Sequence, residues 1–342
     1  MPSYMRPIIA ALAAVPYTAA QTFTKCNPLN TTCPPDPGLA NYTFHTDFTT
    51  GDSAFDYWNT TSGSVNSTQQ GAAFVINKQG DSPTIQTDFY FFFGHVDVRM
   101  KVASGTGIIS SIVFLSDDLD EIDWEGIGTY NYEIETNYFG KDNTTSYARA
   151  TYPNVTTPCD EFHIYSIDWT HEQIQWFVDG DLKRTLAYED ALNGQNFPQT
   201  PMVLRLGIWA GGDPSAGEGT VEWAGGETDF SDAPFTMYVE SVNITNYYPA
   251  ESYTYGDTTG AYASIVKSNS SSTSNSSETA STKKNGTTTL DTNSASYTGS
   301  NTSSSAASAN SSVATSTAGS VVAGLTMSPV AVMSAAVLYL FM

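Results

Sequence analysis

The chain has 342 residues, and 13 Lys+Arg against 35 Asp+Glu give a net charge of −22. This charge excludes nucleic acid as a partner, because proteins that bind nucleic acids need a basic surface. A composition that is 40% hydrophobic and 13% aromatic can bury a sizeable core, so the chain is not disordered throughout. It has no HxH or HExxH spacing, no GxxxxGKS/T loop and only three cysteines, so we expect no metal, no cofactor and no disulfide scaffold.

Residues 1–20 have the composition of a targeting segment. Arg6 precedes an apolar run at residues 8–15, and small residues follow at 18–20. This order predicts a secretory signal peptide that is cleaved after Ala20. The alternative is a buried N-terminal helix.

Residues 21–265 are expected to form one folded unit, whose length is normal for an all-β sandwich. Cys26 and Cys33 lie seven residues apart in a Pro-rich loop, and secretion would place them in an oxidising compartment. We therefore predict a disulfide between them. Cys159 is left over, and we expect a buried thiol there, because the sequence places no base beside it.

Several segments have the pattern of β-strands. Residues 95–102 alternate polar and apolar side chains, as a half-buried strand does. Residues 174–178 and 182–186 flank Asp179-Gly180, a favourable turn pair, and predict a hairpin. Similar strand patterns cover residues 202–209 and 235–242. Helical periodicity is nearly absent, so the predicted fold is a sandwich of two antiparallel sheets.

One predicted strand carries acids at every second position. Alternate side chains of a strand share a face, so Glu121, Asp123 and Glu125 should line one face. Ile122 and Trp124 should then enter the core. Three like charges on one face repel each other, so at least one carboxyl group should keep its proton to higher pH than usual.

This pattern fits a retaining glycosidase, in which one carboxylate attacks the sugar carbon and a protonated carboxyl about 5–5.5 Å away donates to the leaving oxygen. Glu121 and Glu125 are about 13 Å apart at Cα along an extended strand, a gap that long side chains on a concave strand can narrow. Asp123 is suited to hold the nucleophile or to modulate proton traffic. The spacing leaves open which glutamate has which role, and it also leaves open a solvated acidic strand without chemistry.

Other polar and aromatic residues are candidates for sugar binding. Arg205 and Trp209 are four apart on one predicted strand and share a face, so they could bind sugar hydroxyls and stack on a sugar ring. The alternatives are a surface charge for Arg205 and a core position for Trp209. Tyr138 and Lys141 follow the acidic strand on what should be the neighbouring strand.

The C-terminal part has the composition of a stalk and an anchor signal. Residues 266–310 are rich in Ser and Thr and predict a disordered, O-glycosylated stalk. Residues 311–342 contain a spacer and an apolar tail, as in the propeptide of a GPI anchor. Asn310 is the preferred attachment residue, ahead of Gly319 and Ser312, and a plain transmembrane anchor is the alternative. Twelve Asn-x-Ser/Thr sequons fit a secreted chain.

The acidic segment resembles the ExDxE signature of glycoside hydrolase family 16. The wider sequence, from residue 22 to 262, resembles the fungal cell-wall branch of that family, the Crh transglycosylases. The matching stretches are residues 26–29 with 33–35, 87–94, 136–141, 209–214, 222–226 and 249–255.

The resemblance implies a β-jelly-roll with a concave substrate cleft. It makes Glu121 the nucleophile, Asp123 its assistant and Glu125 the acid/base, which also contacts the substrate. It further implies a strand at Thr220 that borders the same cleft, with Trp223 beside it. The implied reaction cleaves chitin, holds the fragment on Glu121 and passes it to a glucan or chitin chain, which cross-links the cell wall.

Two alternatives remain at this point. One is an ordinary β-glucanase or chitinase of the same fold, with water as the acceptor. The other is a non-catalytic carbohydrate-binding wall protein. The expected partners are chitin, β-glucan and, through a GPI lipid, the outer face of the plasma membrane, and the chain is expected to act as a monomer.

Overall fold

The computed structural model describes residues 24–143 and 149–269. The predicted signal peptide, residues 270–310 of the predicted stalk and the anchor segment with Asn310 lie outside the described residues. The first residues of the predicted stalk, 266–268, are wrong as stalk, because they belong to strand β17 (Ile265–Ser268), which pairs with β16 (Ser252–Tyr255). Within the described ranges, no helix is both long enough and apolar enough to cross a membrane.

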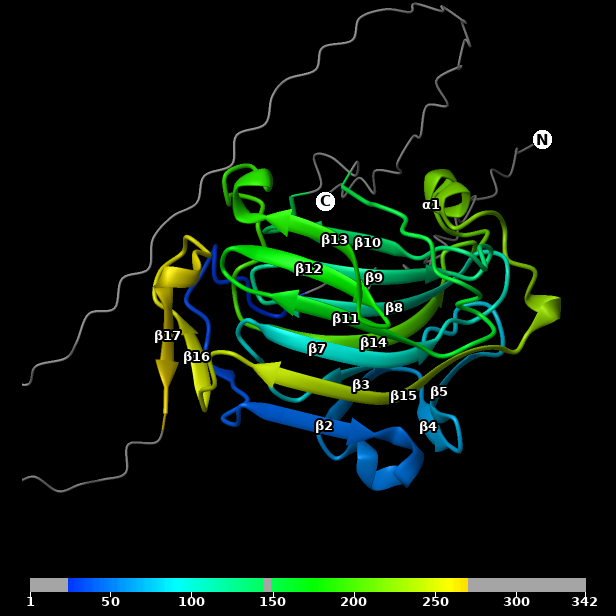
Figure 1. Ribbon diagram of the computed structural model, residues 1–342, viewed down its shortest axis with the longest axis horizontal. Coiled ribbons are helices and arrows are strands. Elements are labelled where there is room, and N and C mark those ends of the chain that lie inside the picture. The colour runs from blue at the N-terminus through cyan, green and yellow to red at the C-terminus, as the bar shows by residue number, and fades with distance from the viewer. Residues whose placement is uncertain (1–23, 144–148, 270–342) are drawn as a thin grey trace, which may run out of the picture. The chain divides into compact units, whose positions relative to one another are not determined.

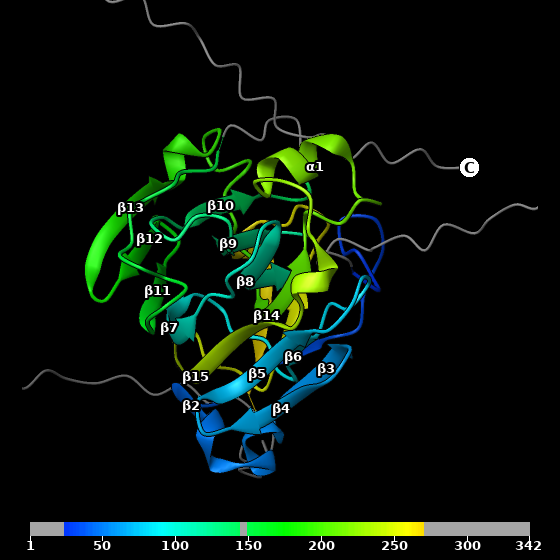
Figure 2. The same ribbon diagram turned by 90° about the vertical axis from the view of Figure 1, so that its right-hand side faces the viewer.

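Two antiparallel sheets form the body of the fold, in agreement with the predicted sandwich (Figures 1 and 2). The six-stranded sheet has the order β10 (Glu135–Phe139), β9 (Glu121–Ile127), β8 (Ile108–Ser116), β14 (Met202–Ala210), β6 (Thr84–Thr87) and β3 (Trp58–Ser62). The eight-stranded sheet has the order β13 (Asp181–Ala187), β12 (Gln173–Val178), β11 (His163–Trp169), β7 (Gly94–Lys101), β15 (Phe235–Asn246), β5 (Gly71–Ile76) and β4 (Val65–Thr68), and β2 (Thr43–Asp47) also pairs with β15.

Smaller elements surround this sandwich. A three-stranded sheet contains β1 (Asp36–Pro37), β16 (Ser252–Tyr255) and β17 (Ile265–Ser268). Short 3-10 helices are η1 (Phe48–Thr50), η2 (Asp52–Phe55), η3 (Tyr188–Asp190), η4 (Phe230–Asp232) and η5 (Tyr262–Ser264). The α-helix α1 (Glu218–Trp223) corrects the sequence prediction at Thr220, where a strand was expected. The strand was expected from the resemblance to family 16 alone, and six residues are too few for their own pattern to distinguish a helix from a strand.

The predicted strands are otherwise confirmed. β7 alternates buried and half-buried residues along its whole length. β12 and β13 form the predicted hairpin, and Asp179 and Gly180 at its turn have φ values of 51° and 85°, as the primed hairpin turns require. β15 continues four residues beyond its predicted end, to Asn246, where it still pairs with β7.

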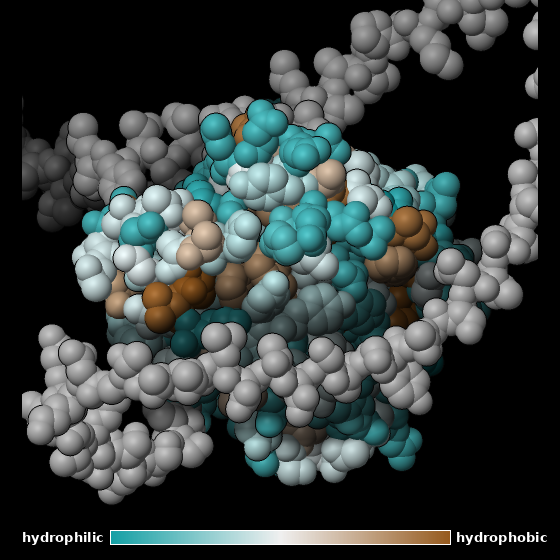
Figure 3. Space-filling view, turned by 60° about the vertical axis from the view of Figure 1, so that its left-hand side comes forward, coloured by the Kyte–Doolittle hydropathy of each residue, from teal (hydrophilic) through white to brown (hydrophobic). Residues whose placement is uncertain are grey.

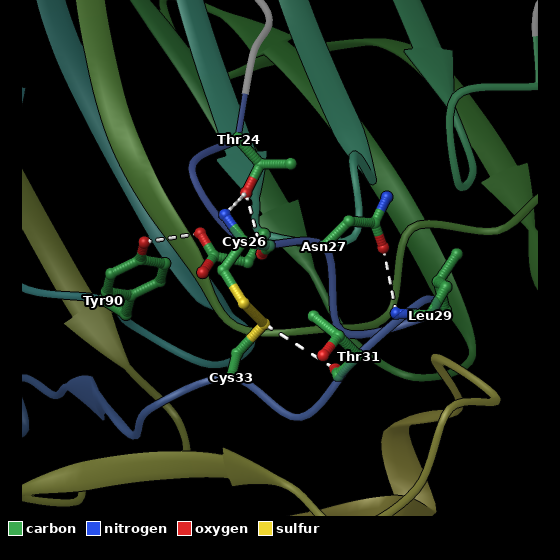
Figure 4. The surroundings of a disulfide bond; sticks show 8 residues. Thr24, Cys26, Asn27, Leu29, Thr31, Cys33 and Tyr90 are labelled. Carbon is green, nitrogen blue, oxygen red and sulfur yellow. Dashed lines mark hydrogen bonds between the residues drawn. A yellow bond between two sulfur atoms is a disulfide. The ribbon is translucent and has the colours of Figure 1, made fainter.

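The predicted disulfide is confirmed, whereas the thiol of Cys159, which was expected to be buried, is half-buried. Cys26 and Cys33 form a disulfide with a Cα–Cα distance of 5.9 Å, which closes a short N-terminal loop (Figure 4). Cys159 is a free, half-buried cysteine. Burial raises the pKa of its thiol to about 11, so a reactive thiolate is scarce near neutral pH.

The surface reflects the acidic composition. Figure 3 shows the side of the molecule that carries the β16–β17 sheet, where hydrophilic residues predominate and apolar residues form separate patches. Exposed apolar side chains in the described ranges include Leu182, Leu192 and Val266. Scattered residues of this kind are normal on a soluble domain.

Two tryptophans join the sheets at the acidic strand. Trp124 of β9 is fully buried, and its Nε1 donates to the backbone oxygen of Ser166 in β11 at 3.3 Å. In return, Trp176 of β12 donates from Nε1 to the backbone oxygen of Asp123 in β9 at 3.1 Å. These reciprocal bonds fix the distance and rotation of β9 relative to the opposite sheet, and therefore which way its other face points.

We expect Trp176→Phe to lower the free energy of unfolding by about 1–3 kcal/mol, since it removes a buried hydrogen-bond donor and packing volume. The amides of β9 should also exchange hydrogen faster. Trp169→Phe is the matched control, because Trp169 is equally buried and donates from Nε1 to Pro198 at 2.9 Å, away from β9. Urea unfolding and hydrogen-exchange mass spectrometry measure both effects. Equal exchange of β9 in the two variants would contradict the proposed anchoring.

Candidate active site

The acids of β9 lie on one face of the six-stranded sheet. Ile122 and Trp124 are fully buried in the core, so the residues between them project to the opposite side. Glu121 and Glu125 are half-buried, and Asp123 is only 2% exposed. The sequence prediction that these three side chains share a face is therefore confirmed. We call this surface of the six-stranded sheet the carboxylate face.

Neighbouring strands extend the carboxylate face. Directly opposite the three acids, β8 contributes Leu115, Val113 and Ser111. On the other side, β10 contributes Phe139, Asn137 and Glu135. Paired residues of antiparallel strands point to the same side, so the acids are framed by both apolar and polar side chains.

Glu121 and Asp123 form a hydrogen-bonded acid pair. Burial raises the pKa of Glu121 to about 7, although the hydrogen bond with Asp123 and the charge of Arg205 act in the opposite direction. Burial, followed by the charges of Glu121 and Glu125, raises the pKa of Asp123 well above its usual range. As the pH rises, Glu121 is therefore the first of the two to ionise, and Asp123 keeps a proton that it donates to Glu121.

Glu125 is the protonated partner. Burial raises its pKa well above the usual range, and the charges of Glu135 and Glu121 raise it further. Ser111 Oγ donates to Glu125 Oε1 at 3.4 Å and acts in the opposite direction. The carboxylate face thus combines Glu121, whose pKa is about 7, with Glu125, whose pKa is raised well above its usual range. A nucleophile and a general acid require two carboxyl groups that hold their protons to different pH.

Arg205 supports the ionised form of Glu121. It lies on β14 opposite Val113, whose other neighbour is Asp123, and it is 3% exposed. The possibility that Arg205 is a surface charge is therefore wrong. Burial lowers its pKa, while the negative charge of Glu121 acts to raise it. The guanidinium of Arg205 is thus a cation placed next to the readily ionised carboxyl group.

An aromatic pair lies near the Glu125 end. Trp209 of β14 and Trp223 of α1 stack with ring centroids 5.8 Å apart and an interplanar angle of 23°. Trp223 Nε1 donates to Glu135 Oε2 at 2.6 Å. Trp209 is half-buried and packs in a small apolar cluster outside the main core. Thr220 is half-buried on the same helix as Trp223.

Two predicted binding residues are not on the carboxylate face. Tyr138 pairs with Ile122, so it points to the core side of the sheet, where it is 5% exposed. Lys141 lies beyond the end of β10, and its Nζ is 3.2 Å from Asp120 Oδ1 and 4.0 Å from Asp118 Oδ2. The sequence placed both residues after the acidic strand but could not define the register of β10.

Glu135 was missed by the sequence analysis. It stands directly opposite Glu125 on β10, and it is 2% exposed. Its signal in the sequence is weak: a single acid in a five-residue strand, whose partner is defined only by the pairing of β9 with β10.

The described ranges contain no group of three or more His, Cys, Asp or Glu side chains arranged to hold a metal ion. Two hollows of 470 and 330 Å³ share Tyr188 and lie near η3. Neither is lined by an acid of β9. We place the candidate site at the carboxylate face because the chemically suited side chains are there.

Comparisons with known proteins point to one family. The model of glycosyl hydrolases family 16 matches residues 51–225. Crh-like protein 5 of Aspergillus fumigatus is 58% identical over 263 residues, which are 77% of this chain and 66% of that protein. Crh-like protein 2 of Botryotinia fuckeliana is 57% identical over 253 residues, 73% of this chain and 56% of that protein. The chain therefore spans less than two thirds of the length of either relative.

Solved structures agree with this similarity. A structure of the Crh5 transglycosylase in complex with NAG matches with a TM-score of 0.70 at 58% identity, covering 71% of this chain and all of that one (100%). A Bacillus licheniformis β-glucanase matches with a TM-score of 0.50 at 22% identity, covering 61% of this chain and 100% of that one. The second similarity concerns the fold alone.

We expect Arg205→Met to raise the pKa of Glu121 above its present value of about 7, because the substitution removes the cation that favours the carboxylate. Side-chain ¹³C NMR of labelled glutamate, assigned with Glu121→Gln, measures this shift. Arg99→Met is the control, since Arg99 is half-buried on β7, in the opposite sheet, and pairs with Glu240. An unchanged or lower pKa of Glu121 would show that Arg205 has no such effect.

Proposed function

The chain belongs to family 16 of the glycosyl hydrolases, and we propose that it is a retaining transglycosylase, which cleaves chitin and transfers the fragment to β-glucan or chitin chains of the fungal cell wall. The observation that carries this proposal is the position of Glu121, Asp123 and Glu125 on one face of β9, where the pKa of Glu121 is about 7 and that of Glu125 is raised well above its usual range.

The proposed reaction is a double displacement. Glu121 attacks the anomeric carbon while Glu125 transfers its proton to the leaving glycosidic oxygen, and a covalent glycosyl-enzyme forms. Asp123 holds Glu121 through their hydrogen bond and limits the build-up of negative charge. Glu125, now deprotonated, then takes the proton of an acceptor hydroxyl, and the new glycosidic bond releases Glu121. Two inversions retain the configuration at the anomeric carbon.

The choice of substrate rests on the relatives and on the aromatic pair. The similar Crh5 transglycosylase was solved with NAG, the unit of chitin, which supports chitin as the donor. Trp209 and Trp223 offer ring surfaces near Glu125, on which sugar rings can stack. An acceptor sugar bound there would compete with water for the glycosyl-enzyme and favour transfer over hydrolysis. Arg205 and Thr220 remain proposed substrate contacts.

The proposed location follows from the ends of the chain. We propose that residues 1–20 direct secretion and that the folded unit expected over residues 21–265 is the catalytic domain, which extends to Ser268 at the end of β17. A glycosylated stalk would follow, up to residue 310. Residues 311–342 would be exchanged for a GPI lipid at Asn310, which places the domain beside the polysaccharides of the wall. We also propose that it acts as a monomer.

The test uses a labelled chitin oligomer as donor and an unlabelled β-glucan oligomer as acceptor. We expect a coupled product from the wild-type chain and a loss of at least about a thousandfold in Glu121→Gln, because the covalent intermediate cannot form. Glu172→Gln is the control, since Glu172 is exposed in the turn between β11 and β12. New reducing ends without coupled product would identify a hydrolase instead, and no turnover would favour a binding protein.

A further inference from the structure

The double displacement leaves one buried acid of the carboxylate face without a function. Glu135 is 2% exposed and lies directly opposite Glu125 in the β9–β10 pairing. A buried carboxylate next to the general acid carries a desolvation cost, so it needs compensating partners. The groups that contact the carboxyl group of Glu135 indicate its role.

Three neutral donors surround Glu135. Trp223 Nε1 donates to Oε2 at 2.6 Å, and Asn137 Nδ2 donates to Oε1 at 3.3 Å. Tyr152 donates a third hydrogen bond from its hydroxyl, and the charge of Arg184 acts in the same direction. Donors and a cation favour the ionised form, and they oppose the effect of burial, which raises the pKa of Glu135 to about 7.

The charge of Glu135 acts on the general acid. After burial, Glu135 is the largest cause of the raised pKa of Glu125, ahead of Glu121. Glu135 accepts from Trp223 Nε1 at 2.6 Å and from Asn137 Nδ2 at 3.3 Å, whereas Ser111 Oγ donates to Glu125 at 3.4 Å. The shorter hydrogen bonds favour the negative charge on Glu135, so Glu135 ionises before Glu125. Between these two transitions, Glu125 carries the proton and Glu135 carries the charge.

On this basis we propose that Glu135 is a positioning residue of the reaction: it keeps the proton on Glu125, and it fixes Trp223 against Trp209. This inference rests on the proposed function. In the first displacement, the proton moves from Glu125 to the leaving oxygen as the bond to Glu121 forms. In the second, the proton of the acceptor hydroxyl moves to Glu125 as the bond to Glu121 breaks. Glu135 exchanges no proton with the substrate, but its charge makes Glu125 the stronger base in the second step.

Glu135 also holds the aromatic pair of Trp209 and Trp223 in place. The Nε1 bond to Glu135 links the indole of Trp223 to the strand that pairs with β9. The same carboxylate thus connects the acid/base to the ring surface on which the sugar is proposed to stack. Proton state and sugar position are set by one side chain.

Two substitutions separate these effects. Glu135→Gln removes the charge but keeps an oxygen that can accept from Trp223, so the basic limb of the pH profile of kcat/KM should move down by at least about one pH unit. Trp223→Phe keeps a ring and the charge but removes the donor, so the limb should stay in place while KM for the acceptor rises several-fold. Glu135→Asp keeps a carboxylate, so the basic limb should return most of the way to its wild-type pH. Glu135→Asp also serves as the second variant if Glu135→Gln does not fold. Glu240→Gln is the control, since Glu240 is half-buried on β15, in the opposite sheet, and pairs with Arg99.

A readout independent of turnover keeps this test distinct from that of the proposed function. In ¹³C-labelled protein, the pKa of Glu125 should fall in Glu135→Gln whether or not chitin is the substrate. The inference would be overturned if, in Glu135→Gln, both the basic limb of the pH profile and the pKa of Glu125 stayed at their wild-type values. So would a loss of rate that is equal at every pH and is not rescued by Glu135→Asp, because a purely structural residue would behave in that way. If the wild-type protein is inactive on chitin but the pKa of Glu125 still falls in Glu135→Gln, only the proposed reaction is overturned.

Discussion

The reciprocal indole bonds of Trp124 and Trp176 are the constraint on which the site depends. Trp124 reaches from β9 to the backbone of Ser166, and Trp176 reaches back to the backbone of Asp123. The main chain of β9 accepts a hydrogen bond from the opposite sheet, and the ring of Trp124 on one side of β9 is buried in the core. These two contacts allow the strand a single orientation. The acids on its other side must then project away from the core. The packing of β9 on its core side therefore determines the direction in which the acids of the carboxylate face point.

The grouped acids are unfavourable for folding and useful for chemistry. Burial opposes every ionised carboxyl, and each neighbouring acid adds repulsion. The structure resolves this conflict by distributing protons: Arg205 favours charge on Glu121, Asp123 keeps a proton, and Glu125 keeps another. The resulting order of ionisation is the one that a double displacement needs. The same repulsion that destabilises the cluster thus raises the pKa of Glu125, as its proposed role of general acid requires.

Part of this site was predictable from the sequence because it depends on local periodicity. Alternation placed Glu121, Asp123 and Glu125 on one face, and the resemblance to family 16 is confirmed by the comparisons. Predictions that required the register between strands were less successful. Tyr138 was expected near the acids, yet it pairs with Ile122 and enters the core, and Lys141 pairs with buried aspartates instead. A shift of one residue reverses the face, and nothing local defines that register.

By itself, the sequence determined the β-rich class, the strand with its three acids and the disulfide between Cys26 and Cys33, because each depends on residues that are close in the chain. Only the tertiary structure decided that Glu135 faces Glu125, that Arg205 is buried beside Glu121, and that α1 brings Trp223 onto Trp209. These contacts join residues up to 84 positions apart in the sequence, from Glu121 to Arg205, so their formation depends on sheet pairing and packing. The proton state of a carboxyl group follows from such neighbours, and for that reason it could be derived only after the chain was folded.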